Sequence, residues 1–524
     1  MNILEIRNES NIYTGFKLIS FELNGNTLFG DIKYEFIENE DKQDKIYTTV
    51  LIGQNGTLKS RLFQKIISLF WNLYDLKIGK EVKFQDKFSL KYAMNNSVYD
   101  FTNKSEMNTK SPILKKNGDE VINLKDAELP LSILAVSIMI TDRYPFPNEE
   151  LFNLYQYLGS RYRPQLASTK AFIGKVVELI SNNIDSKTFV EGVRKIVNEF
   201  LQSSNKPFIV YNTKKSNLFF TGILKKEEFN SYFESINQKY ENSMANAPFK
   251  LNNYNNIKKD KLIVEEIVRF CNQIYEINDW NELNKNSSKK IKFNLFEESD
   301  IIKLREQFKL LDHLRKLGIV DTPDIEFLRI KNDIKNINYE GYPIIESSSG
   351  EISLLGSLIG ILASIKQNSL IFIDEPEISL HPNWQMKYLT ILRELLCDKK
   401  YSTCHIIIAT HSHFLISDLK GGNSKIIGLK NKNNKIEIID FQKNINTFGW
   451  SAENVLLNVF DVATTRNFYI AEKLSQIFKI AAKSENPNLD EYKEELIEWH
   501  NQLTNNDPLH YAIEKLIEKM KWEN

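Results

Sequence analysis

Residues 369–379, SLIFIDEPEIS, place the tightest constraint on how this chain folds. Four consecutive apolar residues lead directly into the acidic pair Asp374 and Glu375. A short apolar run of this kind is typical of a strand that is buried on both faces of a parallel sheet. Because open α/β sheets bind ligands at the carboxyl ends of their strands, Asp374 is expected to hold magnesium and Glu375 to activate water. A surface turn after a buried strand is the alternative interpretation.

A phosphate-binding loop is predicted near the beginning of the chain. Strand-like residues 45–52 run into a glycine-containing turn, and a helical pattern follows at 61–74. Backbone N–H groups and a helix N-terminus surround phosphates in this arrangement, in which Lys59 is expected to reach the β- and γ-phosphates and Ser60 to bind magnesium. Leu58 is a departure, because the motif has glycine before the lysine; an ordinary glycine turn is the alternative. The predicted loop residues are Gly53, Gln54, Asn55, Gly56, Thr57, Leu58, Lys59 and Ser60.

Two further apolar runs also end in polar residues. Residues 129–140 precede Asp142 and Arg143, and residues 405–410 precede His411. If these runs are parallel strands, their carboxyl ends lie on the same sheet edge as the acidic pair. Asp142 is therefore a possible site residue, although a structural turn is the favoured interpretation there. His381, in the segment that follows the acidic pair, is a second possible site residue.

A serine-glycine segment precedes a strongly apolar helix at 341–366. Small hydroxyl residues and glycine at a helix start expose backbone N–H groups next to the positive end of the helix dipole, which suits a γ-phosphate. The same residues also make a good plain helix N-cap. The residues of this predicted signature are Ser348, Ser349, Gly350 and Glu351.

The middle and the end of the chain are predicted to be mostly helical. Short amphipathic helices without sustained heptads cover about 168–318, which indicates a compact lobe with a modest antenna. Lysines in this lobe are candidates for nucleic-acid contacts, with a solvated charged face as the favoured alternative; they are Lys258, Lys259, Lys261, Lys289, Lys290 and Lys292. The expected boundaries are 1–165 and 336–445 for the two parts of one α/β domain, 166–335 for the inserted lobe and 446–524 for a helical region that binds a partner or another copy.

Composition excludes little. The chain has 524 residues, 68 Lys and Arg against 68 Asp and Glu, and so no net charge that favours or disfavours nucleic acid as a whole. Three widely spaced cysteines fit reduced thiols, and no stretch of eighteen apolar residues occurs. The expectation is a soluble, cytoplasmic protein without a membrane partner.

The chain resembles the ATP-binding-cassette ATPases in the order of its motifs. The phosphate-binding loop comes first, then the signature, then the strand that ends in Asp374 and Glu375, and last the strand that ends before His411. The resemblance implies an α/β fold: a P-loop head with a mixed β-sheet flanked by helices, an inserted helical lobe and a helical C-terminal tail. It also implies ATP and Mg²⁺ as cofactors, with ATP hydrolysis as the reaction. Ser60 and Asp374 then serve the metal, Glu375 orients the attacking water, and His411 senses the γ-phosphate.

The same resemblance implies a homo-oligomer, at least a dimer, with ATP at the interface. In that arrangement Ser348–Glu351 of one copy cap the nucleotide bound by another. Leu58 is expected to slow hydrolysis while leaving nucleotide binding intact.

Finer motifs narrow the resemblance. DEPEISLHP, ATHSH and SSSGE are similar to the SMC-like, OLD-like and RecF-like branch that works on DNA. AVSIMITDRYPFP, THSHFLISDL and FGWSAENVLLNVF resemble the PtuA-type ATPases of Septu and some retron anti-phage defence systems. This implies DNA as a partner and a separate HNH nuclease subunit of PtuB type. Residues 412–524 contain no DxD motif, so a nuclease within this chain is not expected. A DNA-repair or chromosome-maintenance ATPase is the alternative, and a transport cassette is disfavoured.

Overall fold

The computed structural model forms two compact units, Met1–Gly449 and Trp450–Asn524. The first unit is a mixed α/β structure, and the second is helical. The structure describes residues 15–38, 45–103, 112–121, 123–139, 142–146, 154–163, 166–201, 207–213, 223–241, 249–277, 290–333, 336–417, 419, 422–432, 435–439, 447, 449–459, 467–483, 489–504 and 507–521.

A seven-stranded sheet in the order β19-β18-β3-β17-β16-β8-β9 forms the centre of the first unit. All neighbouring strands are parallel except β18 and β19. Every residue of β16 and β17 is buried, as their apolar sequences predicted. The run at 129–140 forms a shorter strand than its length suggested. The bounds are β3 Tyr47–Gly53, β8 Ser132–Ser137, β9 Tyr155–Tyr157, β16 Ser369–Asp374, β17 His405–Thr410, β18 Ser424–Lys432 and β19 Lys435–Ile439.

The register of this sheet aligns the strand ends that carry the polar residues. Asp374 of β16 pairs with Ala409 of β17 and with Ser137 of β8, while Thr410 pairs with Ile52 of β3. Four parallel strands therefore finish within one or two residues of one another. The predicted convergence of these carboxyl ends at one sheet edge is confirmed.

A second, antiparallel sheet has the order β2-β1-β4-β5-β6-β7. Helix α1 (Lys59–Lys77) packs between the two sheets: the Phe63 ring lies 4.8 Å from that of Phe372 in β16, and the Phe70 ring 5.8 Å from that of Phe16 in β1. Strands β1 and β2 form a hairpin whose turn lies at residues 27–29. The bounds are β1 Phe16–Asn26, β2 Gly30–Glu35, β4 Lys87–Met94, β5 Ser97–Asn103, β6 Ile113–Lys116 and β7 Asp119–Glu120.

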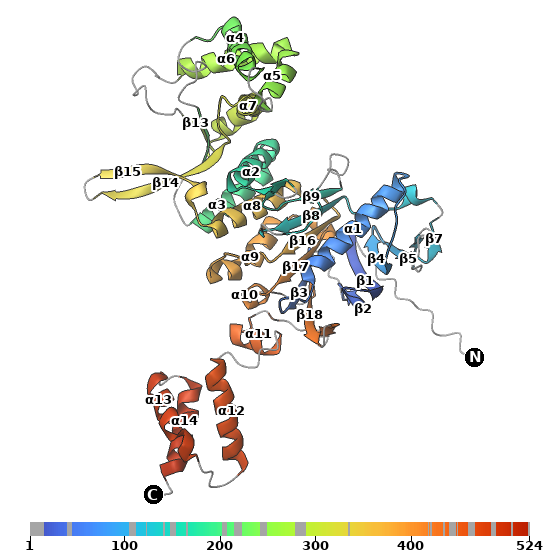
Figure 1. The fold of residues 1–524 in the computed structure, drawn as a ribbon, viewed down its shortest axis with the longest axis vertical. Coiled ribbons are helices and arrows are strands. Elements are labelled where there is room, and N and C mark those ends of the chain that lie inside the picture. The colour runs from blue at the N-terminus through green and yellow to red at the C-terminus, as the bar shows by residue number, and fades with distance from the viewer. Residues whose placement is uncertain are drawn as a thin grey trace. The chain divides into compact units, whose positions relative to one another are not determined.

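Helices cover the other face of the central sheet (Figure 1). The largely buried α8 (Ser349–Ser364) packs there, and α2 (Thr169–Asn183) and α3 (Lys187–Leu201) pack on α8. A Cβ at Gly356 of α8 would lie 2.2 Å from the Phe172 ring of α2, so glycine allows this close approach. Further elements of the first unit are α9 Pro382–Leu395, α10 His413–Ile416 and the 3-10 helices Leu124–Asp126, Ile344–Glu346 and Lys399–Thr403.

The inserted segment contains the predicted helices but also strands that were not expected. A four-stranded antiparallel sheet, in the order β13-β12-β14-β15, joins residues from 207 to 343. Strands β12, β13 and β14 are separated by helices and pair over long distances in the sequence, whereas β14 and β15 form a local hairpin that was not predicted from the sequence. The helices are α4 Lys226–Glu241, α5 Phe249–Lys258, α6 Lys261–Ile277 and α7 Glu298–Lys316; the strands are β12 Pro207–Asn212, β13 Lys290–Asn294, β14 Asp324–Asp333 and β15 Asn336–Pro343, with a small hairpin of β10 Arg161–Arg163 and β11 Leu166–Ala167.

This sheet changes the interpretation of two candidate nucleic-acid contacts. Lys290 and Lys292 both form ion pairs with the buried carboxylate of Glu326. Their charges are therefore used within the fold. Lys258 pairs with Glu234, whereas Lys289 lies outside the described residues.

The second unit has a small core of its own. Three of its helices contribute Leu474, Leu496 and Ile513, among other apolar residues. Among the helices of the described residues, none combines the length and the apolar character needed to cross a membrane. The elements are α11 Ala452–Asn458, α12 Phe468–Lys483, α13 Lys493–Gln502, α14 Pro508–Lys521 and the 3-10 helix Asp490–Tyr492.

Candidate functional site

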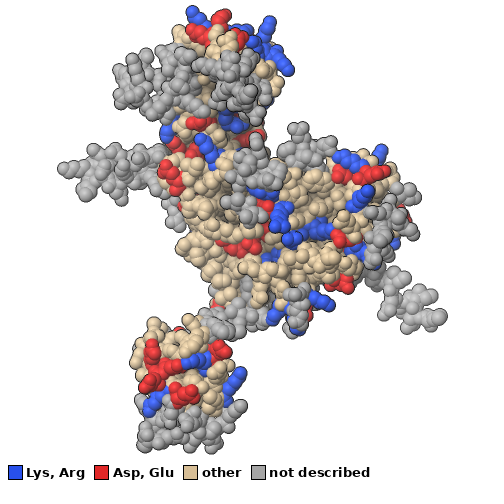
Figure 2. Space-filling view, viewed as in Figure 1, with Lys and Arg blue, Asp and Glu red and all other residues tan. Residues whose placement is uncertain are grey.

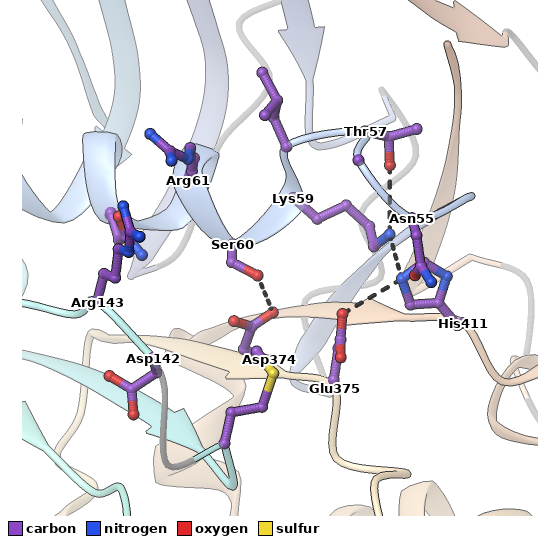
Figure 3. A pocket seen from close by; sticks show the side chains of 14 residues that line it. Asn55, Thr57, Lys59, Ser60, Arg61, Asp142, Arg143, Asp374, Glu375 and His411 are labelled. Atoms are coloured by element: carbon purple, nitrogen blue, oxygen red, sulfur yellow. Dashed lines mark hydrogen bonds and ion pairs between the residues drawn. The ribbon is translucent and has the colours of Figure 1, made fainter. Parts of the chain in front are cut away.

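A pocket of about 330 Å³ opens at the carboxyl edge of the central sheet (Figure 3). It brings together residues from the loop between β3 and α1, from α1, from the ends of β16 and β17, and from the loop after β8. Several of its residues were not singled out from the sequence, namely Arg61, Gln64 and Met139. The lining residues are Asn55, Gly56, Thr57, Leu58, Lys59, Ser60, Arg61, Gln64, Met139, Asp142, Arg143, Asp374, Glu375 and His411.

The loop between β3 and α1 has the backbone of a phosphate-binding turn. Gly56 has a left-handed φ of 82°, and a Cβ at Gly53 would lie 2.4 Å from the carbonyl oxygen of Leu429 in β18. Leu58 is also left-handed, with φ 61°, and serves as the N-cap position of α1. Glycine adopts this conformation without the steric cost that a Cβ brings, which explains why the motif has glycine there. Leu58 keeps the glycine-like backbone and packs its side chain against the core.

Lys59 is buried beneath this loop. Its Nζ donates to the carbonyl oxygen of Gly53 at 2.9 Å and lies within 3.4 Å of the Gln54 carbonyl oxygen and the Thr57 hydroxyl. Burial lowers the pKa of Lys59 to about 8, against the opposing pull of nearby carboxylates. A weakly solvated ammonium at a helix N-terminus is poised to bind an anion, because the anion replaces the hydration that the cation lacks.

Ser60 and Asp374 meet in the middle of the pocket. The Ser60 hydroxyl donates to Asp374 Oδ1 at 3.1 Å, and the Tyr144 hydroxyl donates to Asp374 Oδ2 at 2.9 Å. Burial raises the pKa of Asp374 to about 6, although both hydrogen bonds favour its charged form. A buried carboxylate next to a hydroxyl provides the hard oxygen ligands that Mg²⁺ prefers.

Glu375 and His411 lie on the Lys59 side of the pocket (Figure 3). His411 Nε2 is 2.8 Å from Lys59 Nζ and 3.3 Å from Glu375 Oε1. The two contacts are alternatives, because Nε2 carries either a lone pair that accepts from Lys59 or a proton that it donates to Glu375. The hydrogen bond from His411 is the main cause that lowers the pKa of Glu375. The side chains of Lys59, His411 and Glu375 are therefore linked in a row, and the position of the proton on His411 depends on what Lys59 contacts.

The backbone around Glu375 fixes its direction. Glu375 has a left-handed φ of 48°, and its N–H donates to the Ala409 carbonyl oxygen at 2.8 Å. Strained backbone held by surrounding bonds is characteristic of functional positions. Glu377, which the sequence did not single out, accepts the N–H of His411 at 2.5 Å, and burial raises its pKa. Glu377 thereby ties the two strand ends together.

The signature is not part of this pocket within one chain. Ser348 caps α8: its hydroxyl accepts the N–H of Glu351 at 3.2 Å, and the Glu351 carboxylate accepts the N–H of Ser348 at 2.9 Å. Ser348 and Ser349 are exposed, whereas Gly350 is buried so tightly that a Cβ would lie 2.1 Å from the carbonyl oxygen of Ser379. The segment is thus a capping box whose hydroxyls face outward.

The two possible site residues have structural partners. Asp142 lines the pocket, but its carboxylate accepts from the Arg161 guanidinium and from the Tyr157 hydroxyl, both at 2.5 Å. His381 is exposed, does not line the pocket, and caps α9 by accepting the N–H of Asn383. The structure gives both residues positioning or capping contacts.

Comparisons with solved structures find only distant likenesses. A chain from "Structure of the recombination mediator protein RecF-ATPrS in RecFOR pathway" is 13% identical, covering 82% of this chain and 100% of that one with a TM-score of 0.28. One from "Crystal structure of the SmcHead bound to the C-winged helix domain of ScpA" is 12% identical, covering 81% and 98% with a TM-score of 0.31. One from "Crystal structure of Stu0660 of Streptococcus thermophilus" is 13% identical, covering 80% and 76% with a TM-score of 0.27. Scores this low carry no argument about function.

A comparison with curated proteins finds no match. A family model matches residues 222–417, which contain the signature and the ends of β16 and β17 but not the loop at Gly53–Ser60. This segment is therefore similar to the family described as "AAA domain, putative AbiEii toxin, Type IV TA system".

Proposed function

We propose that the chain binds and hydrolyses ATP with Mg²⁺, as the ATPase subunit of a prokaryotic anti-phage defence complex of PtuA type. One observation carries the ATPase part of the proposal. Lys59, Ser60, Asp374, Glu375 and His411 come from three separate strand ends and line one pocket. The match of residues 222–417 to an AAA family supports the same reading.

The residues present fit a triphosphate with magnesium. Lys59 and the backbone N–H groups of the loop would hold the β- and γ-phosphates. Ser60 and Asp374 would hold the cation, because their oxygens are 3.1 Å apart and the carboxylate is buried. When bound, Mg²⁺ neutralises charge on the β- and γ-phosphates.

The roles of Glu375 and His411 follow from the contacts of the pocket. Glu375 is aimed into the pocket by its strained backbone, so it can accept a hydrogen bond from a water and orient it toward the γ-phosphate. A phosphate that draws Lys59 away leaves His411 Nε2 free to donate a proton to Glu375 or to the phosphate. His411 is in this way suited to report which groups occupy the pocket.

Two copies are expected to share each nucleotide. The exposed Ser348 and Ser349 lie at the N-terminus of a sixteen-residue helix, and they do not line the pocket of their own chain. A helix N-terminus with exposed hydroxyls suits a phosphate presented by another molecule. The resemblance to ATP-binding-cassette ATPases supports a dimer in which the signature acts across the interface.

The defence role, the HNH nuclease partner and DNA binding rest on the resemblance to PtuA-type ATPases. Basic and acidic side chains are intermixed on the visible face of the first unit (Figure 2), so DNA contacts would use local sites. A DNA-repair ATPase without a nuclease partner is the second candidate, favoured by the same resemblance to RecF-like proteins. Purification of the tagged chain from its native host distinguishes the two: an HNH protein that co-purifies supports the defence role, and DNA-stimulated turnover of the isolated chain supports repair.

The ATPase proposal is tested by phosphate release from purified protein. Wild-type protein should release phosphate only with Mg²⁺, and neither Lys59→Ala nor a Gly350→Ala variant should do so alone. A mixture of these two variants should recover part of the activity, because each heterodimer then contains one intact composite site. No recovery in a mixture that forms dimers would contradict the shared site.

A further inference from the structure

Tyr144 connects the proposed magnesium ligand to a buried ion pair. Its side chain is 2% exposed, and its hydroxyl donates to Asp374 Oδ2 at 2.9 Å across a sequence separation of 230 residues. Asp374 Oδ1, by contrast, faces the Ser60 hydroxyl inside the pocket. One carboxylate oxygen is therefore held from behind, while the other is presented with Ser60.

The backbone of Tyr144 is held on both sides by the ion pair. Its N–H donates to Asp142 Oδ1 at 3.1 Å, and its carbonyl oxygen accepts from Arg161 Nη2 at 2.7 Å. The same Arg161 Nη2 lies 2.5 Å from Asp142 Oδ1, and both side chains are less than 10% exposed. The Tyr157 hydroxyl completes the cluster by donating to Asp142 Oδ2. These bonds leave the Tyr144 hydroxyl little freedom to move.

We propose that Tyr144 is a positioning residue for the metal site, and that the Asp142–Arg161 pair acts through it. The inference rests on the proposed function, because it assigns Asp374 to the cation. It gives Asp142 a role different from that of a ligand: its two oxygens are committed to Arg161, Tyr144 and Tyr157. Partners that hold a metal-binding carboxylate from behind fix its orientation, and their loss typically lowers metal affinity about 10- to 100-fold.

A neighbouring tyrosine supplies a matched control. Tyr155 is 1% exposed, and its hydroxyl donates to the Pro145 carbonyl oxygen at 2.9 Å instead of to Asp374. Tyr144→Phe and Tyr155→Phe each remove one buried hydroxyl and one hydrogen bond. Only the first of them frees Asp374. A structural effect common to both changes is thereby separated from an effect on the metal site.

The experiment measures Mn²⁺ binding by electron paramagnetic resonance, with the non-hydrolysable nucleotide AMP-PNP present. Tyr144→Phe should raise the Kd for Mn²⁺ about tenfold, and Tyr155→Phe should leave it within twofold of wild type. Metal-free AMP-PNP binding in EDTA should be unchanged in both variants. An Mn²⁺ Kd for Tyr144→Phe within twofold of wild type would overturn the proposal.

A separate experiment tests the ion pair, and its result does not depend on whether Tyr144→Phe folds. Arg161→Lys keeps the charge but replaces the planar guanidinium that serves Asp142 and Tyr144 together, so the Mn²⁺ Kd should rise at least threefold. Combined with Tyr144→Phe, it should add little, because both changes act through the same hydroxyl. Full additivity would overturn the assigned route. If wild type itself binds no Mn²⁺ with nucleotide, the proposed function fails; if it binds and only Asp374→Asn abolishes binding, this inference alone fails.

Discussion

Asp374→Asn should make the metal-free protein more stable at neutral pH. Asp374 is 1% exposed, and burial raises its pKa from 3.8 to about 6. The unfolded chain therefore releases this proton at lower pH than the folded chain. A rise of about two pKa units corresponds to roughly 3 kcal/mol of destabilisation above pH 6. An uncharged amide does not carry this cost.

The loss of a hydrogen bond in the Asp374→Asn variant offsets part of this gain in stability. The amide can accept only one of the two hydrogen bonds from Ser60 and Tyr144, and a lost bond of this kind costs about 1 kcal/mol. The expected net increase is about 2 kcal/mol in the free energy of unfolding at pH 7.5. As the pH falls from 6 toward 3.8, the folded carboxyl takes up its proton, and the difference between the variant and wild type should shrink.

Thermal unfolding in EDTA at pH 7.5, 6 and 5 measures both the gain and its pH dependence. The exposed Asp126→Asn is the control, because it removes the same charge without relieving burial. A saturating mixture of Mg²⁺ and ATP should reverse the order, since a ligand at 100 times its Kd adds about 2.7 kcal/mol to wild type alone. A lower melting temperature for Asp374→Asn in EDTA at pH 7.5, or a difference that grows on acidification, would refute the reasoning.

Three further outcomes follow from the same geometry. Glu375→Gln should keep ATP binding and lower turnover about 100-fold or more, measured by phosphate release, because the amide cannot take a proton from water; turnover within fivefold of wild type would count against the assignment. Leu58→Gly should change the free energy of unfolding by less than about 1 kcal/mol, since relief of the left-handed backbone offsets the lost packing, and calorimetry should show an ATP Kd within threefold of wild type; a tenfold change would show that the leucine distorts the loop. Gly350→Ala should lower stability by about 1–3 kcal/mol in urea unfolding, because its Cβ meets the Ser379 carbonyl oxygen at 2.1 Å. Gly360→Ala in the same helix, with its nearest contact at 3.6 Å, is the matched control and should be neutral or stabilising.

Local patterns in the sequence were sufficient for the main elements of the site. The apolar runs of β16 and β17 specify buried parallel strands, and the rule that such strands bind ligands at their carboxyl ends places Asp374 and His411 together. The loop before α1 follows from its glycines and its lysine-serine pair. Even the serine-glycine segment has the helix start that its capping residues predict.

Contacts between segments that are far apart in the sequence could not be predicted from local sequence patterns. Tyr144 and Asp374 are 230 positions apart, and neither the residues around Tyr144 nor those around Arg161 reveal that they meet. The pairings of β12 with β13 and β14 were missed for the same reason, because they span long helical insertions, whereas the β14–β15 hairpin is local and was also missed. For Lys290 and Lys292, nucleic-acid contacts and a favoured solvated face were the two alternatives, and neither predicted that both lysines pair with Glu326 of that sheet.

Calorimetric titration of ATP into the purified chain tests the central claim most directly. With Mg²⁺ present, wild type should bind one ATP per chain, and EDTA should weaken the binding because Ser60 and Asp374 then contribute nothing to it. Lys59→Ala, folded as judged by its melting curve, should bind at least tenfold more weakly, since it removes the buried ammonium under the loop. The absence of binding by folded wild-type protein, or equal affinity in Lys59→Ala, would contradict the assignment of this pocket to ATP.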